Sequence, residues 1–151
     1  MTEPDHPRSR QSHAMRATTL DDWGKLVLRI TVAGLLLFHG LAKVTGGVGW
    51  MAQPLGAVGL PAFVAYGVYA GEVVAPLLAV VGKFTRIAGA LIAINMFAAI
   101  MLVRRDELFT IQEQGGGLAT ELELAFLFGG VALALLGSGR YALSRGQGRW
   151  D

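Results

Sequence analysis

The stretch IAGALIAINMFAAIMLV, residues 87–103, contains no charged side chain and a single polar one, Asn95. An α-helix of this length rises about 26 Å, close to the roughly 30 Å thickness of the hydrocarbon core of a bilayer. A helix of a soluble bundle needs a polar stripe that faces water, and this stretch has none. It therefore predicts a helix that crosses a membrane.

Similar stretches recur along the chain. Charged residues are also absent from 30–42, 44–71, 73–82 and 124–139. Segments of about the 17–25 residues that a transmembrane helix needs can be placed over these stretches. The sequence predicts an all-α fold, an integral-membrane bundle of four transmembrane helices at about 23–44, 60–82, 86–103 and 120–137.

The two ends of the chain differ from this membrane domain, which we place at 23–144. Residues 1–22 hold seven of the 24 charges, include Pro4 and Pro7, and show no apolar period. We expect them to form a polar, flexible tail. Residues 145–151 are expected to form a short C-terminal tail.

The composition excludes several classes of protein. Of the 151 residues, 53% are hydrophobic and 16% are charged, where about 25% charged is usual for soluble proteins. A net charge of +2 is too small for a nucleic-acid-binding face. The chain has no cysteine, so it forms no disulfide and offers no thiolate ligand. Any redox role must therefore use a bound cofactor or a partner subunit.

The distribution of Lys and Arg predicts the orientation. With an even number of spans, both termini lie on one side, which the charge count identifies as the cytoplasm. The opposite side then holds Arg104 and Arg105, with Lys43 close to that surface. The cytoplasmic side holds nine basic residues: Arg8, Arg10, Arg16, Lys25, Lys83, Arg86, Arg140, Arg145 and Arg149.

Ionisable residues inside the spans are the candidates for function, because burying one in a bilayer costs about 2.5–3.5 kcal/mol even on lenient scales. The first helix carries Arg29, His39 and Lys43. At about 100° per residue, His39 and Lys43 lie about 40° apart and Arg29 within about 80° of them, so one face is basic. The alternative is that both long cations extend to the membrane surfaces while His39 makes a packing hydrogen bond.

Glu72 is the only charge between Lys43 and Lys83, and it falls near the middle of its helix. It is either protonated or paired with Arg29 or His39 across the helix interface. A purely structural ion pair and a functional acid are both open.

Polar residues on the third and fourth helices complete the candidate set. Asn95 is expected to join helices or to line the site. Thr120 and Glu123 fit a capping box that opens the fourth helix, and Glu121 could approach Lys43. Glu121 and Glu123 point about 200° apart, so they cannot share a site. The candidate intramembrane site is therefore Arg29, His39, Lys43, Glu72, Asn95 and Glu121. No metal site is predicted, because only one histidine lies in a span and no ligand cluster is present.

Several runs in this order resemble the DoxX family of small membrane proteins. The resemblance covers about residues 25–144, with an Arg, an HG pair and a Lys in the first helix, a Glu in the second, and a G-x-x-T-R turn. Where the family often ends in S-L-D, this chain has Ala142-Leu143-Ser144. The matching runs are LRITVAGLLLFHGLAKVTGG (28–47), LGAVGLP (55–61), GEVVAPLLAVVGKFTRIAGALIAINM (71–96) and ALLGSGRYALS (134–144).

The resemblance implies a four-helix protein of the bacterial inner membrane that takes part in respiratory or sulfur redox chemistry. The first hypothesis is a membrane subunit or anchor of a quinone-linked oxidoreductase, in which His39 and Glu72 bind a quinone and move protons, with Arg29 or Lys43 stabilising the reduced anion. The alternatives are a non-catalytic scaffold, whose buried charges only fix helix packing, and a small proton-coupled transporter. The expected partners are the lipid bilayer and other oxidoreductase subunits or further copies of this chain. As an enzyme, the chain would be at most a non-autonomous subunit.

Overall fold

The computed structural model describes residues 7–112 and 115–151, with side chains from residue 18 onward. Within these ranges the chain is helical, and its only β-type pairing is an isolated bridge between Ile111 and Leu118. The all-helical membrane fold predicted from the charge-free stretches is confirmed. Large apolar side chains such as Phe38, Phe97 and Phe128 are exposed, as expected of a surface that faces lipid.

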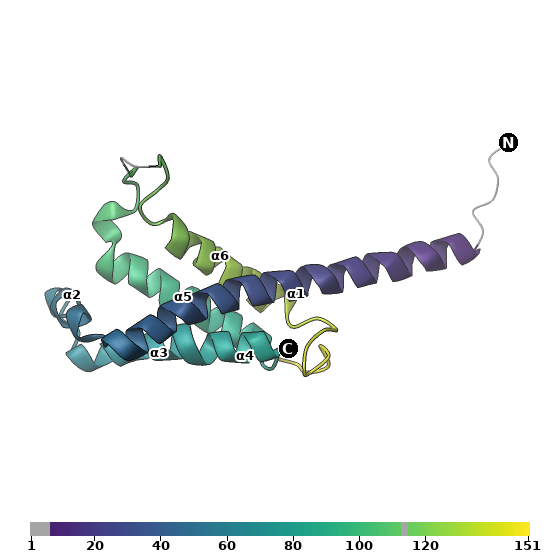
Figure 1. Cartoon of the computed structure of the whole chain (residues 1–151), viewed down its shortest axis with the longest axis horizontal. Coiled ribbons are helices and arrows are strands. Elements are labelled where there is room, and N and C mark those ends of the chain that lie inside the picture. The colour runs from purple at the N-terminus through teal and green to yellow at the C-terminus, as the bar shows by residue number, and fades with distance from the viewer. Residues whose placement is uncertain (1–6, 113–114) are drawn as a thin grey trace.

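The first helix, α1, runs from Pro7 to Gly46 and extends beyond the bundle at its N-terminal end (Figure 1). It starts well before residue 23, so most of the segment predicted to be a flexible tail is helical, and residues 1–6 lie outside the described residues. Residues 8–22 contain neither Gly nor Pro, and a helix already formed in the membrane propagates outward without a new nucleation cost. Pro7 is tolerated because it occupies the first helical position.

The second span, Ala62–Val81, is continuous but changes its winding along its length. It consists of the 3₁₀-helix η2 (Ala62–Tyr66), α3 (Gly67–Tyr69), the π-helix η3 (Ala70–Val74) and α4 (Ala75–Val81). The loop before it holds the short elements η1 (Gly49–Met51) and α2 (Ala52–Ala57). A left-handed Gly82 ends α4.

The third helix, α5, covers Thr85–Val103, and α6 covers Glu121–Leu136. Between them lies the single-turn η4, Arg105–Glu107. In the part of the chain that the structure describes, three helices are long and apolar enough to cross a membrane, at Thr18–Gly46, Ala62–Val81 and Thr85–Val103. The 16 residues of α6 extend only about 24 Å, so the fourth crossing stays a prediction.

The capping box predicted for α6 is wrong. Thr120 precedes the helix but makes no side-chain capping bond. Its hydroxyl instead donates to the carbonyl oxygen of Leu108 at 3.2 Å, which ties the preceding loop to the start of α6. The carboxylate of Glu123 is consequently free to take another partner.

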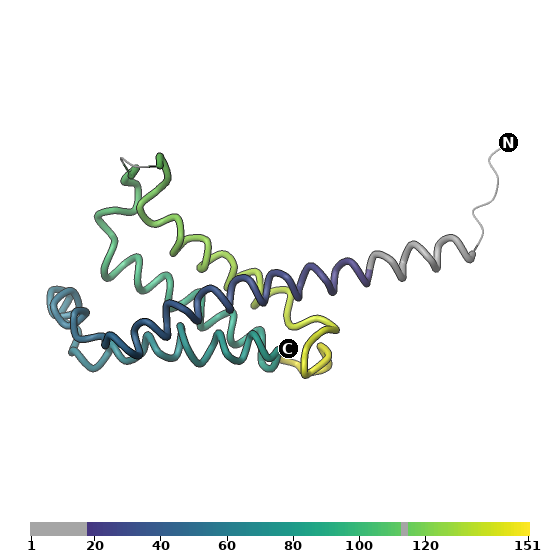
Figure 2. The backbone as a smooth tube through the Cα atoms, in the orientation of Figure 1, coloured from purple at the N-terminus to yellow at the C-terminus, as the bar shows by residue number. Residues whose placement is uncertain are grey.

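The helices are closest where α5 crosses α6. Their backbones touch at Gly89 and Gly130, where a Cβ on either residue would collide with the other helix. Alanines at 33, 75, 79 and 88 are fully buried, and this small-residue core lets α1 and α4 pack closely as well. Figure 2 shows that α5 and α6 diverge toward the loop that joins them.

The opposite end of the bundle is closed by the C-terminal segment. The backbone N–H groups of Leu143 and Ser144 donate to the carbonyls of Val81, the last residue of the second span, and of Gly82 after it. The carboxylate of Asp151 accepts the N–H of Phe84, and Arg86 donates to the backbone oxygen of Asp151 at 3.1 Å. The predicted tail 145–151 therefore packs against the start of α5.

Candidate functional site

A cavity of about 690 Å³ lies between the diverging helices, at the end of the bundle where α1 finishes and α6 begins. Most of its wall is apolar, and residues of α1, α2, the second span, α5 and α6 all contribute to it. Representative apolar side chains are Leu36, Leu55, Val68, Met96, Leu102 and Phe126. A cavity of this size and polarity is typical of a site for a small organic molecule.

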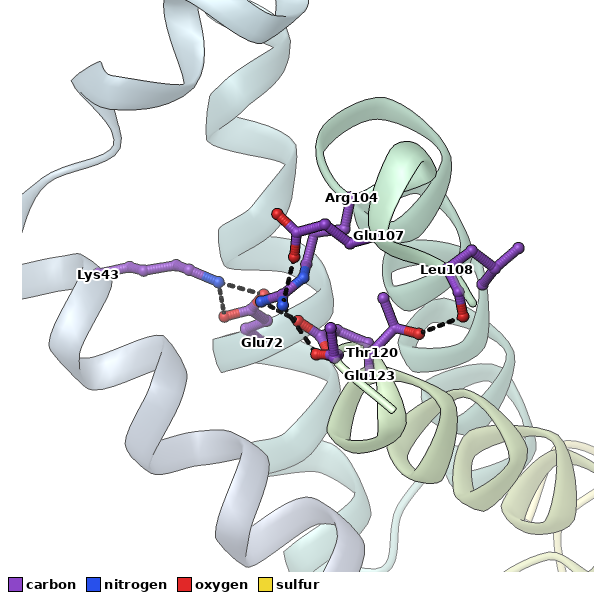
Figure 3. Close-up of polar contacts among 8 residues, drawn as sticks. Lys43, Glu72, Arg104, Glu107, Leu108, Thr120 and Glu123 are labelled. Atoms are coloured by element: carbon purple, nitrogen blue, oxygen red, sulfur yellow. Dashed lines mark hydrogen bonds and ion pairs between the residues drawn. The ribbon is translucent and has the colours of Figure 1, made fainter. Parts of the chain in front are cut away.

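An ion pair between Lys43 and Glu72 forms one wall of the cavity. The Lys43 ammonium lies 2.5 Å from each carboxylate oxygen of Glu72 (Figure 3). The Glu72 side chain is only 2% exposed, whereas that of Lys43 is 25% exposed. The sequence correctly marked Glu72 as a residue that needs a partner, but the partner is Lys43 and not Arg29 or His39.

The backbone around Glu72 departs from a regular α-helix. Glu72 lies in the π-helix, whose wide turn is closed by a hydrogen bond from the N–H of Ala75 to the carbonyl of Ala70. Pro76 follows at once and has no N–H to offer to the carbonyls of this turn. The carbonyl of Glu72 faces α1 instead, at Gly40, where a Cβ would overlap it. Single π turns of this kind are frequent at functional sites.

Two further side chains fix the ion pair in place. The Asn95 amide donates to Glu72 Oε1 at 3.3 Å, so α5 also holds the carboxylate. The Tyr69 hydroxyl donates to the backbone carbonyl of Lys43 at 3.1 Å, which joins the end of α1 to the second span. Glu72 is therefore bonded by side chains from two other helices.

His39 lies in the wall of the same cavity, one turn before Lys43. Its ring meets that of Phe126 edge-on, with the ring centroids 5.7 Å apart. Since this contact leaves the imidazole exposed, its nitrogens can bind a molecule in the cavity.

The cavity wall holds a second charged group, which is not among the site residues predicted from the sequence. Arg104, at the end of α5, lies 3.2 Å from a carboxylate oxygen of Glu123 and donates to Glu107 at 2.8 Å. It also donates to the carbonyl of Ala119 at 2.8 Å. This group and the Lys43–Glu72 pair line the same cavity, and Figure 3 draws the residues of both. The sequence predicts Arg104 only as part of the orientation signal and Glu123 only as part of a helix cap. The wide angle between Glu121 and Glu123 is the signal that could have pointed to one of them facing inward.

Two predicted site residues lie elsewhere. Arg29 is 2% exposed at the opposite end of the bundle, where it donates to the backbone carbonyls of Ser138 at 2.8 Å and Tyr141 at 2.5 Å. Glu121 is exposed beside Gly117 in the loop and does not line the cavity. The candidate site therefore contains His39, Lys43, Glu72 and Asn95 from the predicted set, with Arg104, Glu107 and Glu123 added.

The arrangement offers both hydrogen-bond donors and proton-exchanging groups to a largely apolar ligand. Lys43 and Asn95 present N–H donors, His39 can donate or accept, and Glu72 can hold a proton. Among the described residues, no group of three or more His, Asp and Glu side chains is placed to bind a metal ion.

Comparison with known proteins gives three matches. The DoxX family model matches residues 24–105. A Bacillus subtilis (strain 168) protein named "Putative oxidoreductase CatD" is 36% identical over 120 residues, which cover 80% of this chain and 84% of that protein. An uncharacterized protein of Haemophilus influenzae is 35% identical over 104 residues, covering 67% of this chain and 76% of that protein. No solved structure gives a significant match.

Proposed function

The chain belongs to the DoxX family of membrane proteins, and from that premise we propose that it is a membrane subunit of a quinone-linked oxidoreductase that binds the quinone headgroup in the cavity at Lys43 and Glu72. The relative named as an oxidoreductase supports a redox role. The quinone is our inference from the cavity.

The observation that carries this proposal is the combination of an apolar cavity of about 690 Å³ with polar groups concentrated on its wall. A quinone needs an apolar environment for its ring and tail and hydrogen-bond donors for its carbonyl oxygens. Lys43 and His39 lie on α1, and Asn95 faces them from α5, so donors are available on two sides of the cavity.

A bound quinone would supply the capacity to accept electrons and protons. The residues of this chain would orient it and handle the protons. Lys43 would favour the reduced anion electrostatically, His39 and Asn95 would hold the carbonyl oxygens, and Glu72 would store a proton next to them. The low polarity of most of the wall strengthens each of these interactions.

The electrons would come from a partner. The chain has no cysteine to serve as a redox centre or cluster ligand, so a reductase subunit with its own redox group is the partner that this function requires. We place the complex in a bacterial inner membrane, with four passes and both termini in the cytoplasm. The charge distribution supports this orientation, because the end of the bundle closed by the C-terminal segment carries more Lys and Arg than the cavity end: Lys83, Arg86, Arg140, Arg145 and Arg149 against Lys43, Arg104 and Arg105.

Quinone binding can be tested on the full-length protein purified in a mild detergent. Organic extraction followed by chromatography should recover quinone from the wild type and from Glu121→Gln, a matched loss of an exposed acid outside the cavity. Glu72→Gln should recover much less at the same protein yield and should lower quinone-dependent turnover of the complex. The proposal would be contradicted by equal quinone recovery from Glu72→Gln and the wild type, or by no quinone above the lipid background in any of the proteins.

One observation favours a non-catalytic scaffold as the second candidate. The Lys43–Glu72 pair joins two helices and is bonded to a third, which is the geometry of a packing device. A scaffold would lose protein level when Glu72 is altered and regain it in Lys43→Leu/Glu72→Leu. Turnover that persists in that double variant would favour the scaffold over the quinone site.

A further inference from the structure

We propose that Glu123 carries protons between the aqueous surface and Glu72, and that Arg104 is the positioning residue that holds the Glu123 carboxylate in the cavity wall. This inference rests on the proposed function, since it supplies that site with a proton path. In this role Glu123 passes protons to Glu72 and does not need to touch the ligand.

The first observation is a gradient of exposure among the acids of one cavity. Glu72, Glu123 and Glu107 all line it, and their side chains are 2%, 21% and 53% exposed. Glu72 is thus sealed from bulk water while Glu107 is in contact with it. Glu123 is intermediate in exposure and shares the cavity with both.

The second observation is the way Arg104 fixes the intermediate acid. Its guanidinium contacts Glu123 and Glu107 and also donates to the carbonyl of Ala119. Arg104 therefore bridges the end of α5 to the start of α6 over the mouth of the cavity. The Thr120–Leu108 hydrogen bond holds the same junction, so the carboxylate of Glu123 is kept in a defined place.

The third observation is room for water. A cavity of about 690 Å³ can hold many molecules at about 30 Å³ each, and a water needs only two to four polar partners to be ordered. Carboxylates on the wall supply such partners. Water in the cavity can therefore connect Glu123 with Glu72 by hydrogen bonds.

The remaining titratable groups of the wall are less suited to this role. The Lys43 ammonium is bonded to both carboxylate oxygens of Glu72, so it is already committed to the ion pair. His39 is the main competitor, because an imidazole can both donate and accept a proton. It lies a turn deeper along α1 than Lys43 and packs on Phe126, whereas Glu123 lies beside a surface acid.

Reduction of one bound quinone would take two electrons from the reductase partner and two protons, which Glu72 would deliver one after the other. For each proton that leaves Glu72, Glu123 passes one through cavity water and takes one from the surface by way of Glu107. Each carboxylate returns to its starting state.

The relay is tested on the full-length, ligand-free chain in lipid nanodiscs, where no quinone or partner is needed. A caged acid releases protons by a light flash, and time-resolved infrared spectroscopy follows the protonated carboxyl band that Glu72→Gln abolishes. Glu123→Gln should slow protonation of Glu72 about tenfold or more, while Glu123→Asp and the control Glu121→Gln retain most of the rate. Added formate, a small weak acid, should restore the rate in Glu123→Gln.

The outcomes separate the relay from a structural role and from the quinone site. Unchanged kinetics in Glu123→Gln, or a slow phase that formate does not restore, would overturn the relay. Slowing in His39→Gln with a normal rate in Glu123→Gln would overturn it in favour of a histidine path. Failure of the quinone extraction leaves these kinetics intact, so the two proposals fail independently.

Discussion

Removing Lys43 from the Lys43–Glu72 pair should destabilise the protein more than removing Glu72. In Lys43→Leu, the Glu72 carboxylate stays buried at 2% exposure with only the Asn95 amide to bond it. It must then remain an unpaired charge or take up a proton. In Glu72→Leu, the Lys43 side chain is already 25% exposed and can extend to the membrane surface.

The expected magnitudes follow from this asymmetry. Lys43→Leu should lower the free energy of unfolding by about 3–5 kcal/mol, the usual cost of leaving a buried charge unpaired. Glu72→Leu should cost only about 1.5–3 kcal/mol, the value of the lost charged hydrogen bonds. The double variant should recover most of the loss, because replacing a buried pair by packed apolar side chains is often neutral.

The assay is unfolding of the full-length chain in mixed micelles by a denaturing detergent, monitored by tryptophan fluorescence. The wild type, the two single variants and the double variant form a double-mutant cycle. The exposed pair Lys25–Asp21, whose charged atoms are 2.6 Å apart, gives a matched control cycle with a coupling of at most about 1 kcal/mol. Equal losses in the two single variants, or a coupling no larger than that of the control, would refute the reasoning.

Three further predictions concern the packing of the bundle and its orientation in the membrane. Gly40→Ala should lower the free energy of unfolding by about 1–3 kcal/mol, because its Cβ would overlap a carbonyl of the π turn, whereas Gly34→Ala, which meets nothing within 4 Å, should be neutral or slightly stabilising in the same unfolding titration. Arg29→Lys should cost about 1.5–3 kcal/mol and loosen the C-terminal segment in hydrogen exchange, because an ammonium cannot replace the fork that bonds two backbone carbonyls. Single cysteines at Ser9 and Gln112 should react with a membrane-impermeant reagent from opposite sides of the membrane, and reaction from the same side would contradict the proposed topology.

The sequence was sufficient to predict the class and most of the helices, because the bilayer imposes a length and a polarity that are visible residue by residue. It also identified Glu72 and Arg29 as costly residues, and the structure buries both. Which residues would meet was harder to predict. Helical angles place His39 and Lys43 on one face, but they do not say which helix faces them or how far a lysine side chain reaches.

The unknown orientation of neighbouring helices also explains why Glu121 is predicted in the site although Glu123 is the acid that lines the cavity. The two-residue spacing required one acid to face the bundle and the other to face away, but the choice depends on the rotation of α6. That rotation is set by the contact of Gly130 with α5 and by the Thr120–Leu108 bond. Both are tertiary contacts, so local sequence rules favoured the capping box instead.

The first boundary of α1 was misplaced for another reason. Charge and the absence of an apolar period indicate that a segment is exposed to water. They do not indicate whether its backbone is helical. Residues 8–22 are polar and still compatible with a helix. A change of solvent along a helix therefore does not have to coincide with its end.

The π turn at Ala70–Val74 has a consequence for how such a site arises. A π turn accommodates one residue more than an α turn, and each residue of an α-helix advances the helix by about 100°. Deleting a single residue there would restore even winding and rotate one half of the span against the other. Glu72 would then lose its alignment with Lys43 and Asn95. In this helix, an acid paired with Lys43 and an unpaired charge in the membrane are separated by the gain or loss of one residue.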